Sequence, residues 1–183
     1  DTNTTSQAKV VLIQRVGKTR SFDGITFSKL QDRLETTAQK LNTKLYVYTG
    51  KETVKRTIQI FHEADVIVGY HGAAMANILF ASRQICFIEI STYASTDMSR
   101  SWRTNSNTLR KFRPDLNFFV YRIPLDHGWP TLNTSNVDVH KDADGHIRGF
   151  TNISLPKSDI DNVVNIAENC ALARQTSLVN FRE

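Results

Sequence analysis

His71 and the small residues that follow it have the types and spacing best suited to chemistry. An apolar, β-branched run ends at Gly69, and His71 is followed by Gly72, Ala73 and Ala74, which have almost no side chain. A helix that begins directly after a strand presents free backbone N–H groups and the positive end of its dipole. A phosphate could approach such a backbone closely and accept a hydrogen bond from His71. The pattern therefore indicates an anion cradle with His71 as its catalytic or binding side chain.

Asn77 lies one helical turn further along the same segment. Its amide either caps the approach to this cradle or packs structurally. The whole segment also fits a tight strand–helix junction, in which small residues only let the helix pack against a sheet. Because the fingerprint G-x-G-x-x-G is absent, the residues alone leave both interpretations open.

A second group of polar residues lies in "QRVGKTRSFD", residues 14–23. Arg15, Lys18 and Arg20 surround a short turn, and two guanidinium groups with an ammonium suit a pyrophosphate. The alternative for either arginine is an ordinary surface charge. The letters "VGKT" are not a P-loop, because the upstream glycine is missing.

Glu89 lies inside the apolar run "ICFIEIS". A carboxylate there is costly unless it is paired or reaches the end of the strand. Accepting hydrogen bonds from ribose hydroxyls is one such use, and pairing with a neighbouring arginine is the structural alternative.

Alternating strand and helix signals position these residues. Strands are expected at residues 9–15, 44–50, 65–72, 85–91 and 117–123, because each is a short apolar run. Helices are expected between them: one with the apolar stripe Phe27, Leu30, Leu34, Ala38 and Leu41, one with Val54, Ile58 and Phe61, a short one over 73–80 and a basic one within 97–112. This order predicts an α/β fold, a Rossmann-like doubly wound parallel sheet. Its ligand crevice is then expected beyond the carboxyl ends of the strands, at residues 15–20, Gly50, 71–77 and 89–92.

The alternation ends after Pro124. Residues 125–136 are loop-like, a hairpin turning at Asp144-Gly145 follows, and Ser158 is expected to cap a final helix. The D-x-D letters at residues 142–144 are interpreted as turn chemistry rather than as a metal site. One domain is predicted, with the wound core over residues 9–124 and the loop, hairpin and helix over 125–183.

The composition fits one globular domain with an anionic ligand. The chain is 40% hydrophobic, its net charge is +5 and its pI is about 9.3. This surplus does not by itself require nucleic acid, and the basic stretch over residues 100–113 is interpreted as a solvated helix face. No apolar run approaches the roughly 20 residues that span a bilayer, and the polar start "DTNTTSQ" is not a signal peptide. A membrane contact is therefore expected only through an anchor outside this chain.

Cys86 and Cys170 have neither metal-ligand nor CxxC spacing, so buried free thiols are the plain interpretation, and whether the two pair is left open. Three N-x-S/T sequons, at Asn3, Asn133 and Asn152, are candidate glycosylation sites. Three sequons in a short chain favour the secretory lumen.

The motifs together resemble glycosyltransferase family 61. There an apolar strand ends in H-G-A, a small-residue helix with N-x-x-F follows, and the next strand carries an acidic residue, as in residues 64–91 here. "QRVGKTRSFD" resembles the upstream motif, an arginine, a short turn and R-x-hydrophobic-N, although Asp23 stands where the family usually has Asn. The final hairpin and "SDIDNVVNIAENCAL" resemble the family's C-terminal strand and helix.

The resemblance implies inverting transfer of a sugar, xylose or N-acetylglucosamine, from a UDP-sugar to a glycan or glycoprotein hydroxyl in the endoplasmic reticulum or Golgi lumen. No metal or other cofactor is expected. The implied architecture is GT-B-like, with this chain as the nucleotide-binding half and a missing N-terminal domain that carries the acceptor site and the catalytic base. The residues implied to contact phosphate are Arg15, Arg20, His71, Gly72 and Ala73, and those on the nucleoside side are Asn77 and Glu89. Two other classes stay open: a non-catalytic nucleotide- or glycan-binding module, and a nucleic-acid binder using residues 100–113.

Overall fold

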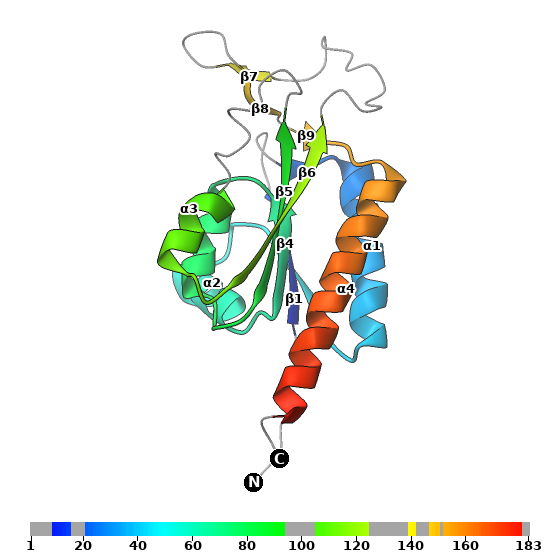
Figure 1. The fold of residues 1–183 in the computed structure, drawn as a ribbon. Coiled ribbons are helices and arrows are strands. Elements are labelled where there is room, and N and C mark those ends of the chain that lie inside the picture. The colour runs from blue at the N-terminus through cyan, green and yellow to red at the C-terminus, as the bar shows by residue number, and fades with distance from the viewer. Residues whose placement is uncertain are drawn as a thin grey trace.

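A five-stranded parallel sheet forms the centre of the protein (Figure 1). The computed structural model describes residues 9–15, 21–93, 105–124, 139–141, 147–150 and 152–180. In hydrogen-bonded order the strands are β3 (Lys44–Tyr48), β1 (Lys9–Ile13), β4 (Val66–Tyr70), β5 (Cys86–Tyr93) and β6 (Asn117–Pro124). Every pairing between them is parallel. The predicted parallel sheet is therefore confirmed.

Helices cover both faces of this sheet (Figure 1). On one face lie α1 (Gly24–Lys40) and α4 (Lys157–Asn180), and on the other α2 (Val54–His62), the 3-10 helix η1 (Ala73–Phe80) and α3 (Asn105–Phe112). Successive strand residues point to opposite faces. Val10 and Leu12 therefore belong to the core under α1 and α4, whereas Val11 and Ile13 belong to the core under α2 and η1. The sheet is doubly wound, as predicted.

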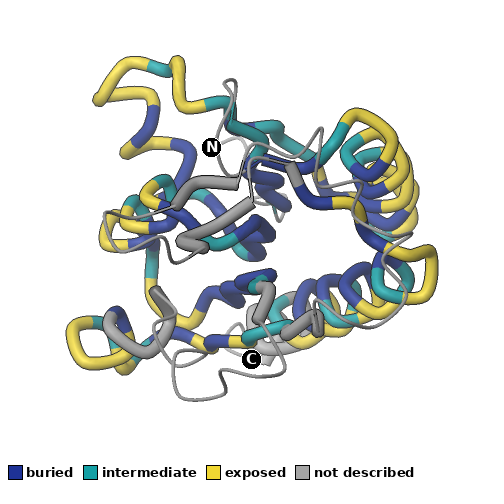
Figure 2. Tube along the Cα trace, turned by 90° about the horizontal axis from the view of Figure 1, so that it is seen from above, coloured by how far each residue is buried: buried dark blue, intermediate teal, exposed yellow. Residues whose placement is uncertain are grey.

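The middle strands are the most deeply buried part of the molecule. Figure 2 looks onto the carboxyl ends of the strands and shows exposed residues on the outward sides of the helices. All of β4 and residues 86–90 of β5 are buried. Their apolar, β-branched composition is typical of parallel strands covered on both sides. Among the buried residues that the structure describes, Glu89 is the single charged one.

Four short strands complete the described elements. β2 (Ser21–Phe22) pairs with β9 (Asn152–Ile153), and β7 (Val139–Lys141) pairs with β8 (Ile147–Phe150) in antiparallel fashion. The second pair confirms the expected hairpin, whose turn with Asp142 and Asp144 lies outside the described residues. The first pair was not expected from the sequence. It ties the segment after β1 to the segment before α4.

The apolar face expected for α2 is confirmed at Phe61 and wrong at Val54 and Ile58. Val54 is 74% exposed and Ile58 is 40% exposed, whereas the buried residues are Thr57, Ile60 and Phe61. This second stripe has helical spacing too, and its threonine has a buried polar neighbour, since Thr57 Oγ1 lies 3.4 Å from the hydroxyl of Tyr48. A hydroxyl with a partner can be buried at little cost. The expected cap of α4 is also wrong, because the helix begins at Lys157, before Ser158.

The interpretation of the cysteines as free thiols is wrong as well. Cys86 at the start of β5 and Cys170 in α4 form a disulfide, with their Cα atoms 6.0 Å apart and a sequence separation of 84. The two are brought together because α4 packs against β5 on the α1 face. Their spacing in the sequence contains no signal for this contact.

Candidate functional site

The carboxyl edge of the sheet contains a topological switch point. From β1 the chain passes to α1 on one face, and from the neighbouring strand β4 it passes to η1 on the other face. The two connections leave in opposite directions, and the ligand crevice of such a sheet is expected between these strand ends. In Figure 1 this edge is the upper one, to which the arrowheads point.

The strand register places the predicted site residues Arg15, His71 and Glu89 at this edge. Ile13 of β1, Gly69 of β4 and Glu89 of β5 are aligned across the sheet. Arg15 follows Ile13 by two residues and His71 follows Gly69 by two. Since the side-chain period of a strand is two, all of these positions belong to the face covered by α2 and η1. The sequence prediction that Arg15, His71 and Glu89 share one edge agrees with this register.

His71 and Glu89 form a hydrogen-bonded pair. His71 Nδ1 lies 2.6 Å from Glu89 Oε1, the glutamate side chain is fully buried and the histidine side chain is 27% exposed. A carboxylate can only accept, so Nδ1–H donates and the ring is held with Nε2 away from Glu89. Within the described residues Nε2 makes no hydrogen bond. Glu89 is thus paired with a histidine, as the pairing alternative allowed, and its role at the nucleoside side stays a prediction.

Gly69 is a residue of the site that the sequence reasoning missed. A Cβ atom on Gly69 would lie 2.8 Å from Ile13 Cβ and 3.1 Å from Met75 Cε. The missing side chain lets β1 and the fully buried Met75 of η1 come close to β4. The only signal in the sequence was a glycine in the middle of a β-branched strand, which indicates a close approach.

The small residues at the start of η1 form the backbone expected to receive an anion. Gly72 is extended, with φ 168° and ψ 175°, a conformation that any residue can adopt. What a glycine contributes at this position is therefore the absence of a side chain. Its carbonyl accepts from the N–H of Met75 at 3.0 Å. No side chain caps this end of η1. The N–H groups of Ala73 and Ala74 come before the first hydrogen bond of the helix, which is the position where helices bind anions.

Arg15 is partly buried and makes no hydrogen bond or ion pair within the described part of the chain. Lys18 and Arg20 lie outside the described residues, and the pyrophosphate clamp stays a prediction. The ends of their segment are joined by Gln14, whose side-chain amide donates to Phe22 O at 3.1 Å and accepts from Phe22 N at 3.2 Å. This glutamine was not singled out from the sequence.

Asp23, where the resemblance led us to expect Asn, is the N-cap of α1. Its Oδ1 accepts from Thr26 N at 2.6 Å. Aspartate and asparagine are both good N-cap residues, so the exchange preserves this contact.

Asn77 points toward the neighbouring strand β3. Its Nδ2 donates to the hydroxyl of Tyr48 at 3.1 Å. This bond ties η1 to the end of β3, which is the structural role left open from the sequence. A contact between Asn77 and a nucleoside stays a prediction.

The loop after β3 supplies hydrogen-bond donors to a carboxylate of the same loop, that of Glu52. Glu52 accepts from Thr49 N at 3.0 Å, from Thr49 Oγ1 at 3.1 Å and from Gly50 N at 2.8 Å. Burial raises the pKa of Glu52, but these hydrogen bonds outweigh it and leave the pKa below its ordinary value. The spacing T-x-x-E was the overlooked signal for such a closed loop. Glu52 is therefore engaged within its own loop.

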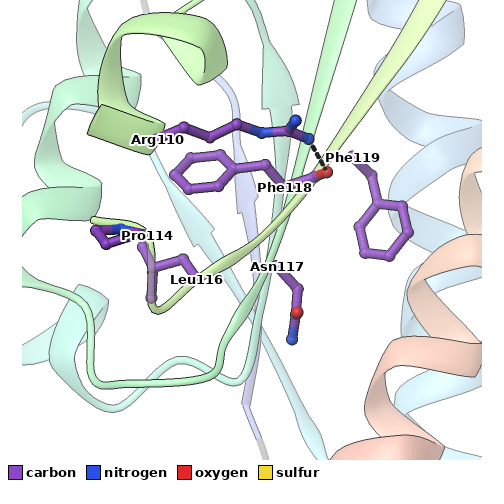
Figure 3. A pocket seen from close by; sticks show the side chains of 6 residues that line it. All are labelled: Arg110, Pro114, Leu116, Asn117, Phe118 and Phe119. Carbon is purple, nitrogen blue, oxygen red and sulfur yellow. Dashed lines mark hydrogen bonds between the residues drawn. The ribbon is translucent and has the colours of Figure 1, made fainter. Parts of the chain in front are cut away.

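A hollow of about 350 Å³ lies elsewhere, between α3 and the start of β6 (Figure 3). Arg110 Nη2 donates to Phe118 O at 2.7 Å, and its guanidinium lies 5.7 Å from the centre of the Phe118 ring. Asn117 N donates to Ile85 O, directly before β5, so the polar backbone groups of Asn117 face β5. The carbonyl of the next residue, Phe118, therefore faces the open edge of the sheet. Arg110 thus covers an edge strand against unwanted pairing. The hollow is at the amino end of β6, away from the crevice.

Neither a group of metal ligands nor a membrane-spanning helix is found among the described residues. No three histidine, cysteine, aspartate or glutamate side chains in the described ranges are grouped so that they could hold a metal ion. No helix in the described part of the chain is long and apolar enough to cross a membrane.

The fold and the crevice define an α/β protein with the strand order 2-1-3-4-5, when the five strands of the sheet are numbered along the chain. Several solved structures are similar to this chain at low identity. A flavodoxin of Streptococcus pneumonia TIGR4 is 9% identical with a TM-score of 0.47, over 91% of this chain and 99% of that one. Oxidised flavodoxin 1 from Bacillus cereus is 6% identical with a TM-score of 0.48, over 91% and 98%. The lysine decarboxylase LdcF of Francisella novicida is 15% identical with a TM-score of 0.43, over 89% of this chain and 17% of that one. Such likenesses carry no functional argument.

The sequence itself relates the chain to glycosyltransferase family 61. Residues 1–88 match the model of the family described as glycosyltransferase 61. The match includes β1, β4, His71 and η1, and it ends one residue before Glu89. It confirms the resemblance and supports a glycosyltransferase. No curated protein matches the sequence.

Proposed function

We propose that this chain is the donor-binding domain of an inverting glycosyltransferase and that it holds a UDP-sugar by its diphosphate at the switch point. The observation that carries the proposal is the partly buried Arg15, without a partner in the described residues, beside a histidine fixed by a buried glutamate. Positively charged side chains at the carboxyl edge of an open parallel sheet suit a phosphate ligand. The match of residues 1–88 to a glycosyltransferase family supports the same reaction class.

In this proposal each group at the crevice has one task. Arg15 and the N–H groups of Ala73 and Ala74 bind phosphate oxygens, and Lys18 and Arg20 add positive charge from the preceding loop. Only the doubly protonated ring of His71 offers Nε2–H to a phosphate, and its charge is then balanced by Glu89 on one side and by the ligand on the other. Glu89 is a positioning residue. Asn77, which is oriented by its bond to Tyr48, is assigned to the nucleoside side.

The reaction consists of one displacement. The acceptor hydroxyl attacks the anomeric carbon, the bond from that carbon to the diphosphate oxygen breaks, and the hydroxyl proton passes to a base. Charge that develops on the departing diphosphate is stabilised by donors already in place, without a resident metal. The base and the acceptor site belong to a further, N-terminal domain of a GT-B-like enzyme. The sugar is xylose or N-acetylglucosamine, and the acceptor is a glycan or glycoprotein.

The compartment proposed is the lumen of the endoplasmic reticulum or Golgi. The Cys86–Cys170 disulfide supports it, because disulfides persist in oxidising compartments. Asn152 of the third sequon lies in β9, and Asn3 and Asn133 lie outside the described residues.

The test is UDP binding, measured by calorimetry on the wild type and on His71→Gln. Alanine is the poorer choice, because it would leave the buried Glu89 carboxylate without this donor and destabilise the fold. Glutamine can still donate to Glu89 but lacks the charged ring donor, so that affinity should fall about tenfold or more, as expected for one charge-assisted hydrogen bond. His62→Gln, at an exposed position of α2, is the matched control and should leave affinity unchanged.

Each outcome has a distinct meaning. Equal affinity of wild type and His71→Gln contradicts the assigned site. Failure of the wild type to bind UDP, or equal binding of ADP and GDP, contradicts the donor proposed. UDP binding without turnover of UDP-xylose or UDP-N-acetylglucosamine by the protein with its N-terminal domain restored would identify a non-catalytic binding module instead.

A further inference from the structure

The eight-residue helix η1 needs support from outside itself. A 3-10 helix has poorer hydrogen-bond geometry than an α-helix and rarely extends beyond three or four residues. Its last carbonyl groups also have no partner within the helix. The position of η1 at the crevice therefore depends on the groups that surround its two ends.

Arg113, directly after α3, supplies partners for the far end of η1. Its Nη1 donates to the carbonyl oxygens of Ile78 at 3.3 Å, Leu79 at 3.1 Å and Ala81 at 2.9 Å. Its Nη2 donates to Ser82 O at 3.2 Å. A positive charge at this end also complements the helix dipole.

Asp115 holds the guanidinium in this orientation. Its two oxygens accept from Arg113 Nε at 2.9 Å and from Nη2 at 2.7 Å. This bidentate bond raises the pKa of Arg113 and lowers the pKa of Asp115. Every nitrogen of the guanidinium thus has a partner, and the side chain is only 16% exposed. Such a fork is fixed in direction in a way that a lysine ammonium is not.

The near end of η1 is fixed by packing. Met75 is fully buried and lies against the backbone of Gly69. The helix is therefore held by Met75 at one end and by Arg113 at the other. The cradle of the proposed function consists of the backbone N–H groups of Ala73 and Ala74. Backbone groups have no rotamers, so any shift of the helix moves them relative to the ligand.

We propose that Arg113 is a positioning residue for the diphosphate cradle, acting through η1 rather than by touching the ligand. The inference rests on the proposed function, because it takes the start of η1 as the ligand's binding surface. Arg113 belongs to the basic stretch that the sequence indicated as a solvated helix face. Its task is instead to set the helix whose other end meets the phosphate.

The test uses Arg113→Lys with Arg110→Lys as the matched control. Arg110 is the neighbouring arginine, and it bonds Phe118 O at the sheet edge rather than a carbonyl of η1. Lysine keeps the charge at both positions but cannot bridge Asp115 and several carbonyls. Two quantities are measured: the backbone amide shifts of residues 72–74 in a ¹⁵N-labelled protein without ligand, and the affinity for UDP.

Arg113→Lys should move the amide signals of residues 72–74 and weaken UDP binding about tenfold, since misplacement of a site by about 1 Å costs up to a hundredfold. Arg110→Lys should change neither. Asp115→Asn should shift the same signals less, and it serves as the second variant if Arg113→Lys fails to fold. Unmoved amide signals, with UDP affinity at the wild-type level, would overturn the inference and leave the proposed function standing. If the wild type does not bind UDP, the proposed function fails, and the amide shifts still report whether Arg113 sets η1.

Discussion

Charged side chains are paired to different extents at the two edges of the sheet. At the amino edge, Asp65 accepts from Lys9 N at 2.8 Å and from Arg174 Nε at 3.2 Å, and Lys9 Nζ pairs with Glu63. Each of these charged side chains finds its partner within the protein. The contacts join β1, the segment before β4 and α4, so their role is to close the fold.

At the carboxyl edge two of the charged or ionisable side chains are less fully paired within the described residues. Arg15 makes no ion pair within the described residues, and His71 uses only one ring nitrogen there. A carboxylate at the end of β3, Glu52, is engaged by its own loop and does not neutralise them. Under the proposed function, the amino edge serves stability and the carboxyl edge binds an anion supplied from outside.

The largest effect on stability is expected from removal of the disulfide, which begins at the amino edge with Cys86. In Cys86→Ala/Cys170→Ala the unfolded chain regains the freedom that the cross-link of 84 residues removes, which should lower the free energy of unfolding by about 4 kcal/mol. Urea unfolding followed by circular dichroism measures the loss. UDP affinity, determined at low temperature where the variant is folded, should stay at the wild-type level. A fall in affinity of the folded variant would contradict the separation of the two edges.

Sequence patterns were sufficient for the sheet. Each parallel strand is a short apolar run, and in the middle strand β4 burial of every residue forces that composition. The shared sheet edge of Arg15, His71 and Glu89 followed too, because these residues come at the ends of such runs and parallel strands end at one edge.

Contacts between distant segments could not be predicted in the same way. The partner of Glu89 depends on the register of β4 with β5, which no local pattern in either strand encodes. The role of Arg113 depends on where η1 ends, and the cysteine pair depends on how α4 lies on β5. In α2 two stripes had helical spacing, and the buried one was chosen by the hydroxyl of Tyr48, a tertiary partner for Thr57.

A matched exchange of two arginines for glutamine tests both edges at once. Arg15→Gln should weaken UDP binding about tenfold by loss of one charge-assisted contact, with the free energy of unfolding changed by less than about 0.5 kcal/mol. Arg174→Gln should do the reverse, because it removes a partner of Asp65 and costs about 1 kcal/mol of stability without touching the crevice. Both variants lose one positive charge, so a general electrostatic effect cancels in the comparison.

Calorimetric titration with UDP and urea unfolding are the two measurements. An equal loss of UDP affinity in both variants would show that net charge, rather than the crevice, attracts the ligand. A large loss of stability in Arg15→Gln would show that this arginine has a structural partner after all.

The smallest expected effect is the pH dependence of the amino edge. The hydrogen bond from Lys9, then that from Gln59, holds the pKa of Glu63 below its ordinary value of 4.5. Below that value the unfolded chain takes up its proton first, so the pair's contribution is present at neutral pH and is lost as the pH falls through and below about 4.5. Since Glu63 is a third exposed, solvent screening keeps the contribution to a few tenths of a kcal/mol. Glu63→Gln should therefore flatten the acid limb of stability against pH slightly and leave UDP affinity at pH 7 unchanged. An acid limb identical to that of the wild type would assign the pairing of this edge to Asp65 and Arg174 alone.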